Sequence, residues 1–223
     1  MPAYSIDRQP RRRFTMGTPD EKSGEQDAVV LVHGLAALPF VMRPLADSLR
    51  DDFGKVVNWG YPSLWSRIER HGSELAELLR KLDREERQGR IHVIGHSMGG
   101  IIARLALAEY LPRRIGRFIM LAPPNRGSHV ARRLAPVLGR ICPPLNQLAD
   151  HDSSFVCTLP QPSVPELGII AAQGDFMVWE PSTRLGCERD HIVLPGLHST
   201  VLWHAETAVQ VRYFLKHGKF RRA

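Results

Sequence analysis

Short and almost continuous apolar runs recur along the chain, separated by amphipathic stretches. Such runs are typical of strands that are buried on both faces of a sheet. They span residues 28–32, 55–59, 90–95, 117–121, 167–172 and 191–194. The stretches with helical spacing cover residues 40–50, 68–87, 98–110 and 207–216. Since strands that alternate with helices form right-handed crossovers, we expect an α/β fold with about six mostly parallel strands and helices on both faces.

Residues 123–165 interrupt this alternation. The segment is rich in proline, which discourages long regular elements. Because so long a connection is unusual in a compact domain, we expect it to form a small cap or insertion over one edge of the sheet. Residues 1–27 are polar and rich in arginine, so we expect a disordered basic lead-in there. The domain itself is then expected to span residues 28–220.

The run Gly95-His96-Ser97-Met98-Gly99 is the strongest chemical motif in the sequence. It follows a predicted strand and opens a predicted helix, which is the context of a nucleophile elbow. In that turn the serine has strained backbone angles, and glycines 95 and 99 avoid Cβ atoms that would collide with neighbouring elements. The first N–H groups of the helix then point at the reaction centre. We therefore predict that Ser97 is a nucleophile.

A serine hydroxyl needs a base to take its proton, and in this arrangement the base comes last in chain order. His198 lies between the last predicted strand and the last predicted helix, and it is our candidate for the base. His191 opens that strand and His204 lies near the start of that helix, so both are weaker alternatives.

An acid that orients the histidine completes a catalytic triad, and in this arrangement the acid should follow the penultimate strand. Asp175 comes directly after the strand at 167–172, at its carboxyl end, where catalytic groups of parallel sheets gather. A carboxylate there orients the histidine and stabilises the imidazolium that forms. Asp190 is the alternative, although it lies at the entry to a strand, and Glu180 is weaker still.

Two aimed N–H groups are needed to stabilise an oxyanion. The backbone amide of Met98, directly after the serine, is one candidate for this oxyanion hole. The amide of Leu35 is the other, because Gly34 allows a tight turn after the first strand. We expect His33 to order this loop by hydrogen bonding rather than to act as a catalyst.

Taken together, these motifs resemble the lipase and esterase branch of the α/β-hydrolase superfamily. The resemblance covers roughly residues 28–220, and it includes Leu121–Ser128, which is similar to a Pro-x-x-x-Gly-Ser segment of bacterial lipase-like hydrolases. It implies an α/β-hydrolase fold and ester cleavage through an acyl-enzyme, with Ser97, His198 and Asp175 as the triad. It implies no metal and no organic cofactor.

This sequence departs from the family pattern in two places. The relatives usually have glycine after the acid, where this chain has Phe176. The segment 128–165 is also short for a lipase lid, so a small cap over a modest acyl pocket fits better than long-chain triglyceride hydrolysis. Four residues are candidates to line that substrate-binding pocket, and ordinary core packing is the alternative for them: Leu134, Val137, Leu138 and Leu145.

The triad does not choose among related reactions. Thioesterase, amidase or acyltransferase chemistry would use the same residues. A different class of function, a non-catalytic module that keeps the fold and binds lipid, predicts a damaged triad, whereas all candidate positions are present here.

Charge adds one possible partner. The net charge is +7, and basic residues cluster at both ends of the chain. We expect solvated, disordered ends, although such clusters can make weak contact with an anionic membrane. No zinc-finger spacing or aromatic-basic platform supports nucleic-acid binding. The clustered residues are Arg8, Arg11, Arg12, Arg13, Lys216, Lys219, Arg221 and Arg222.

Redox and targeting signals are weak. The three cysteines, Cys142, Cys157 and Cys187, do not form a disulfide framework, and a Cys142–Cys157 bridge would be relevant only in an exported protein. The N-terminal positive charges precede no apolar core, and no apolar run approaches the length of a membrane span. The simplest expectation is a cytoplasmic protein, and the oligomeric state is left open.

Overall fold

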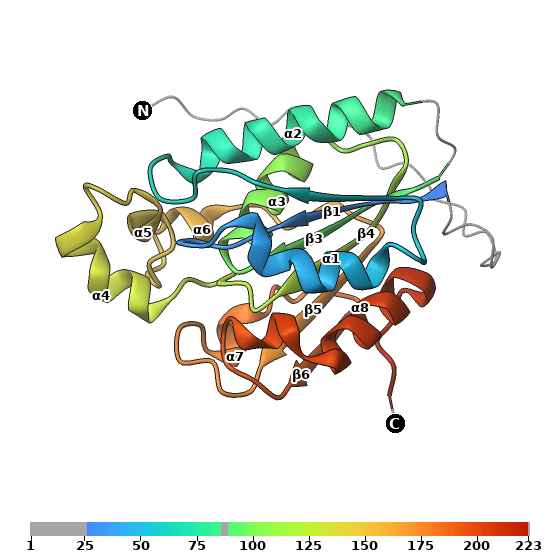
Figure 1. Cartoon of the computed structure of the whole chain (residues 1–223). Coiled ribbons are helices and arrows are strands. Elements are labelled where there is room, and N and C mark those ends of the chain that lie inside the picture. Colours follow the sequence, from blue (N-terminus) through green and yellow to red (C-terminus); the bar gives the residue numbers. More distant parts are fainter. Residues whose placement is uncertain (1–25, 86–88, 223) are drawn as a thin grey trace.

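The computed structural model describes residues 26–85 and 89–222 of the 223-residue chain. Most of the basic lead-in, with Arg8 and Arg11 to Arg13, lies outside the described residues. Within them, six strands form one sheet in the order β2-β1-β3-β4-β5-β6, and every neighbouring pair is parallel (Figure 1). This confirms the predicted sheet. The strands are β1 (Ala28–Val32), β2 (Lys55–Trp59), β3 (Ile91–His96), β4 (Ile115–Leu121), β5 (Glu166–Ala172) and β6 (Asp190–Leu194).

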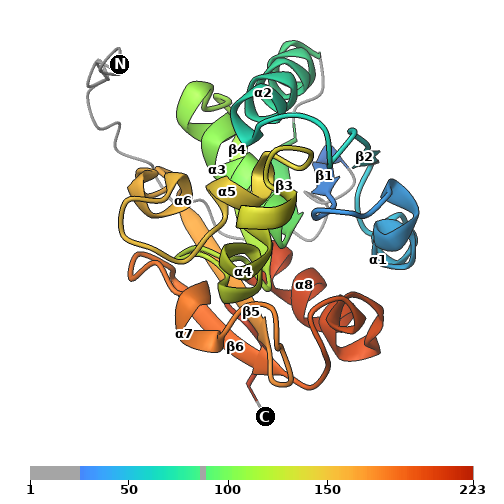
Figure 2. The ribbon, with the colours of Figure 1, turned by 90° about the vertical axis from the view of Figure 1, so that its left-hand side faces the viewer.

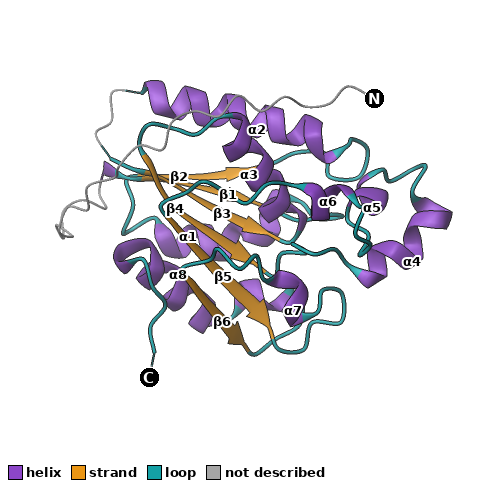
Figure 3. Ribbon diagram, turned by 180° about the vertical axis from the view of Figure 1, so that it is seen from behind, coloured by secondary structure: helices purple, strands orange, loops and turns teal. Residues whose placement is uncertain are grey.

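Helices cover both faces of this sheet (Figures 1 and 3). The helices are η2 (Pro39–Met42), α1 (Arg43–Leu49), α2 (Ile68–Arg84), α3 (Met98–Glu109), α4 (His129–Leu138), α5 (Pro144–Gln147), α6 (Phe155–Thr158), α7 (Glu180–Thr183), η3 (Thr200–Trp203) and α8 (Ala205–His217). Successive side chains of β1 point to opposite faces of the sheet. Val30 therefore packs with α2 and α3, whereas Leu31 packs with α1 and α8.

The helix expected at 40–50 is divided into the short helix η2 and α1. Pro44 has no N–H group, so it cannot form the bond to Phe40 that would continue an α-helix across the junction. Instead, the N–H of Arg43 donates to the carbonyl of Phe40 in the tighter 3-10 pattern. The helix expected at 68–87 ends at Arg84.

The segment 123–165 contains three helices, α4, α5 and α6, although its prolines argued against long elements. Helix α4 even continues through Pro136. Its N-terminus is fixed by Ser128, whose hydroxyl accepts from Ala131 N–H at 3.2 Å and donates to the carbonyl of Met177 at 2.7 Å. These helices lie beyond the carboxyl ends of the central strands (Figure 2).

The C-terminal end is packed, so the expectation of a disordered end is wrong here. The basic side chains of Lys216, Lys219, Arg221 and Arg222 are exposed to solvent, as expected. Gly218 ends α8 in the left-handed region, with a φ of 70°, and turns the chain back. The side chain of Phe220 is then buried, and its N–H donates to Asp190. Gln210 bonds to both the N–H and the carbonyl of Arg221.

In the described ranges, no helix has the length and apolar character needed to cross a membrane. Cys142 is buried, Cys157 and Cys187 are exposed, and all three are free thiols, so the Cys142–Cys157 bridge is not formed.

Candidate active site

Ser97 lies at a sharp turn between β3 and α3. Its φ of 52° and ψ of −125° are unusual for a residue with a side chain. The turn is held by two backbone bonds, from Ser97 N–H to the carbonyl of Leu121 at 2.8 Å and from Gly100 N–H to the carbonyl of Ser97 at 3.0 Å. The strained strand-to-helix turn that the motif predicted is therefore present.

The glycines around the serine allow this turn through close backbone approach. A Cβ at Gly95 would lie 2.5 Å from the Cα of Gly100, and one at Gly99 would lie 2.3 Å from the carbonyl oxygen of Val32. Neither distance is compatible with a side chain. The start of α3 therefore packs directly on the end of β1.

Ser97, His198 and Asp175 form one chain of hydrogen-bonding groups. The Nε2 atom of His198 lies 2.8 Å from Ser97 Oγ, and its Nδ1 lies 2.7 Å from Asp175 Oδ2. All three side chains are nearly excluded from solvent, and the carboxylate is only 2% exposed. They follow β3, β6 and β5, whose carboxyl ends meet at one edge of the sheet.

The loop after Asp175 is ordered by the same carboxylate. Its Oδ1 accepts N–H bonds from Met177 at 2.8 Å and from Val178 at 2.9 Å, while Oδ2 contacts His198. Phe176 stands where the relatives have glycine, and its side chain points outward, with 63% exposed. The departure from the family pattern thus leaves the carboxylate in contact with the histidine.

The alternative histidines, His191 and His204, and the alternative acids, Asp190 and Glu180, form no hydrogen bond with Ser97 or His198 within the described residues. His191 lies 3.0 Å from Thr183 Oγ1 through its Nε2. His204 directly precedes α8. Asp190 begins β6, at the opposite edge of the sheet, where it accepts from Phe220 N–H.

His96 is a component of this site that the sequence reasoning missed. Its Nε2 lies 2.9 Å from the carbonyl oxygen of His198, so this nitrogen carries the proton and donates. Burial is the main cause that lowers the pKa of His96 to about 3, and the nearby His198 lowers it further, so the ring is neutral. No local signal marks this role, because the position before the serine is variable in the elbow motif.

The candidate oxyanion donors lie on the other side of the serine. Met98 is the first residue of α3, so its N–H has no acceptor within the helix. The turn carrying Leu35 lies against the nucleophile, since a Cβ on Gly34 would be 3.0 Å from Ser97 Cβ. The roles of both amides stay predictions.

His33 orders that turn, as its position suggested. Its Nδ1 lies 2.9 Å from the carbonyl oxygen of Gly34, and its ring stacks on Tyr61 with 4.3 Å between the centroids. The Tyr61 hydroxyl donates to the carbonyl of His33 at 2.6 Å. Burial lowers the pKa of His33 and raises that of Tyr61, so both side chains are neutral near pH 7.

The structure separates the four residues expected to line an acyl pocket. Leu134, Val137 and Leu138 lie on α4 and are exposed to solvent. Leu145, by contrast, is buried in the core. Their role in acyl binding stays a prediction.

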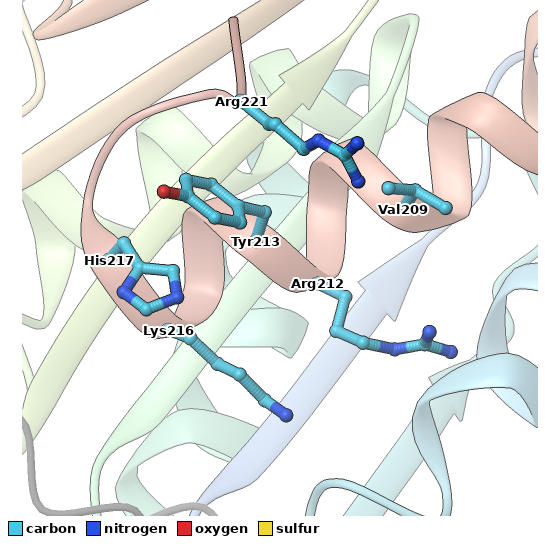
Figure 4. Close-up of a pocket in the computed structure, with 6 residues that line it drawn as sticks. All are labelled: Val209, Arg212, Tyr213, Lys216, His217 and Arg221. Atoms are coloured by element: carbon cyan, nitrogen blue, oxygen red, sulfur yellow. The ribbon is translucent and has the colours of Figure 1, made fainter. Parts of the chain in front are cut away.

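A surface hollow elsewhere is not connected with these groups (Figure 4). It lies on the outer side of α8, and its lining residues are Val209, Arg212, Tyr213, Lys216, His217 and Arg221. Lys216 in this hollow pairs with Asp52, which precedes β2. The hollow is therefore near the amino edge of the sheet, whereas Ser97 lies at the carboxyl edge. Across the described ranges, no group of His, Cys, Asp and Glu side chains is arranged to hold a metal ion.

Solved structures with the same fold include several hydrolases. Aspergillus fumigatus lipase B matches with a TM-score of 0.68 and 18% identity over 88% of this chain, and the chain spans only 54% of that protein. Bacillus licheniformis lipase BlEst2 in its mature form matches with a TM-score of 0.60 and 17% identity, over 90% of this chain and 94% of that one. A thermophilic esterase from Thermogutta terrifontis matches with a TM-score of 0.59 and 17% identity, over 86% and 90%.

At these identities the likeness concerns the fold alone. No curated protein sequence matches this chain significantly. The sequence profile of the Alpha/beta hydrolase family, however, matches residues 29–211, which is most of the chain. The protein is therefore a member of the alpha/beta hydrolase family.

Proposed function

We propose that this protein is a serine hydrolase that cleaves carboxylic esters through an acyl-enzyme intermediate. The observation that carries the proposal is the continuous hydrogen-bonded chain from Ser97 through His198 to Asp175. A buried serine in a strained conformation costs folding free energy, and such strain is found mainly at functional sites. Here the strained turn aligns the Ser97 hydroxyl with the imidazole of His198, which could take its proton.

In this mechanism Ser97 Oγ attacks the acyl carbonyl while His198 Nε2 takes the hydroxyl proton. Asp175 accepts the Nδ1–H of His198, which keeps the ring in the productive tautomer and stabilises the imidazolium. The N–H groups of Leu35 and Met98 stabilise the oxyanion of the tetrahedral intermediate. His198 then protonates the leaving alcohol, and a water molecule activated by the same ring releases the acid.

We propose esters rather than other acyl compounds as substrates because of what the proteins with the same fold are named. Two of the matching structures are named as lipases and one as an esterase. Thioesterase, amidase and acyltransferase chemistry would use the same atoms, so the substrate panel below includes a thioester. A non-catalytic lipid-binding module does not need the alignment of Ser97 with His198.

A fluorophosphonate probe tests the nucleophile. We expect the wild-type protein to be labelled and Ser97→Ala to remain unlabelled. Ser199→Ala is the matched control, because Ser199 is exposed and adjacent to His198. Labelling that persists in Ser97→Ala would place the nucleophile elsewhere.

A panel of p-nitrophenyl esters of graded chain length, with one acyl thioester, then measures the substrate class. If the thioester is turned over faster than every ester, the proposed activity becomes that of a thioesterase.

A further inference from the structure

Helix α4 exposes an apolar stripe that the fold does not bury. Its members are Leu134, Val137 and Leu138, followed by Ile141 in the turn that continues the helix, and their spacing places them on one face. They are 41%, 78%, 42% and 63% exposed, respectively. Of the ten residues of α4, only Ala131 is buried. The apolar face of α2, by contrast, lies in the core.

The charged residues of the segment that carries this stripe are all basic. Between Ser128 and Ala149 the sequence contains arginines but no aspartate or glutamate. Arg132 pairs with Asp150, which lies just beyond this stretch. The side chains of Arg133 and Arg140 are exposed, and neither forms an ion pair within the described part of the chain. A helix with an apolar stripe and unpaired basic residues suits a negatively charged, non-aqueous surface.

The position of α4 relates the stripe to the candidate active site. Figures 1 and 3 show α4 as the outermost helix beyond the carboxyl end of the sheet. Its N-terminal Ser128 donates to the carbonyl of Met177, in the loop that Asp175 orders. The ring of His129 also packs against Trp179, which is 61% exposed, with 4.9 Å between the centroids. The stripe is thus anchored to the loop that carries the candidate acid.

We propose that α4 docks this protein on an anionic phospholipid surface. Val137 and Ile141, with the rest of the stripe, enter the boundary between headgroups and acyl chains, while Arg133 and Arg140 contact lipid phosphates. In this proposal α4, rather than the basic termini, makes the main contact with the membrane.

Two other occupants fit less well. A second copy of the chain would bring the arginines of one α4 toward those of the other, because a twofold interface pairs the same surface with itself. A folded protein partner normally covers about 800 Å² on each side, which four aliphatic side chains do not provide. Insertion into lipid needs no complementary pocket.

Flotation with vesicles tests the proposal on the full chain without any substrate. Vesicles of pure phosphatidylcholine are compared with vesicles containing one quarter phosphatidylglycerol. We expect binding to the anionic vesicles and its loss at high salt. Arg133→Gln with Arg140→Gln should weaken binding roughly 30-fold, from about fivefold for each basic residue. Ile141→Asp should weaken it at least as much.

Three controls make this test specific. Arg113→Gln with Arg50→Gln removes the same charge from exposed residues at the amino edge, and it should change binding less than threefold. Ser97→Ala should bind vesicles like the wild type, because membrane docking does not need the nucleophile. The esterase proposal is tested separately with the fluorophosphonate probe, so the two proposals can fail independently. Thermal unfolding by circular dichroism shows that each variant is folded.

Three outcomes would overturn the proposal. The first is wild-type protein that does not float with anionic vesicles at low salt. The second is loss of binding in Arg11→Gln, Arg12→Gln and Arg13→Gln combined, with no effect of the α4 variants. The third is a concentration-dependent dimer that Ile141→Asp dissolves, which would make α4 a contact between copies of this chain.

Discussion

The Nε2–H of His96 donates to the backbone carbonyl of His198, with 2.9 Å between the atoms. The residue before the candidate nucleophile therefore holds the loop that carries the candidate base. The other ring nitrogen, Nδ1, has no hydrogen-bond partner among the described residues, and it faces the turn at Gly34. His96 thus lies between the base loop and the turn that carries one candidate oxyanion donor.

Replacing His96 should affect turnover more than substrate affinity. We expect His96→Ala to lower kcat about 10- to 100-fold with KM changed less than threefold, because a displaced base loses its alignment with Ser97. His96→Asn keeps an N–H donor and should recover part of kcat. Steady-state kinetics on a p-nitrophenyl ester measures both values. Equal kcat in His96→Ala and the wild type would remove the positioning role.

His96 should also make the fold sensitive to acid. Its pKa is about 3 in the folded protein and near 6.5 when the chain is unfolded. Between these values the unfolded chain binds the extra proton, so stability is lost as the pH falls below about 6.5. At pH 5 this loss is about 2 kcal/mol relative to pH 7. Urea unfolding at the two pH values should show a smaller difference in His96→Asn, and an unchanged difference would contradict the assignment.

Asp175 and Asp190 should separate catalysis from stability. Asp175→Asn should lower kcat by about three to four orders of magnitude. The amide oxygen would keep the two backbone N–H bonds, so the amide NH2 group would face His198 Nδ1, donate to it and favour the wrong tautomer. Asp190→Asn should keep most of the turnover and instead lower stability, since Asp190 holds Phe220 and Arg222. Kinetics and urea unfolding of both variants check this, and the reverse pattern would move the acid to Asp190.

Gly99→Ala should disrupt the elbow, because the new Cβ would lie 2.3 Å from the carbonyl oxygen of Val32. We expect a loss of at least about 3 kcal/mol in unfolding free energy, or failure to fold. Gly186→Ala is the control. Gly186 has a φ of 80°, and its Cβ would meet nothing within 4 Å, so the cost is about 1–2 kcal/mol of backbone strain alone. A similar cost for both variants would argue against the close approach of α3 and β1.

Arg104, on α3, connects that helix to the 123–165 segment, so its replacement should loosen the segment. Its buried guanidinium donates to Asn125 Oδ1 at 3.0 Å and to the carbonyls of Leu159 and Pro160 at 3.0 and 3.1 Å. Burial lowers its pKa to about 10, so it stays charged at neutral pH. Because lysine lacks the planar fork, Arg104→Lys should cost about 2–3 kcal/mol.

Arg104→Lys should also make residues 123–165 more sensitive to limited proteolysis, whereas Arg113→Lys should be neutral, since Arg113 has an 81% exposed side chain. Equal proteolysis of the two variants would show that Arg104 does not hold this segment.

Much of the fold could be predicted from the sequence because its signals are local. The strands at 28–32 and 55–59 have the predicted bounds, since a continuous apolar run shorter than a helix is typical of a buried strand. The turn at Ser97 was recognisable because its glycines are required by backbone contacts within a few residues and by the end of the adjacent strand.

Tertiary structure decided what each side chain contacts. The sequence offered Leu134, Val137 and Leu138 as pocket-lining or core residues, and only the folded chain shows that they lie on one helix, α4, and are exposed to solvent. The bond from His96 to His198 joins positions far apart in sequence, and no periodicity reports it. The spacing of hydrophobic residues indicates which side chains can be buried. Which residues they contact depends on how segments that are distant in sequence pack together.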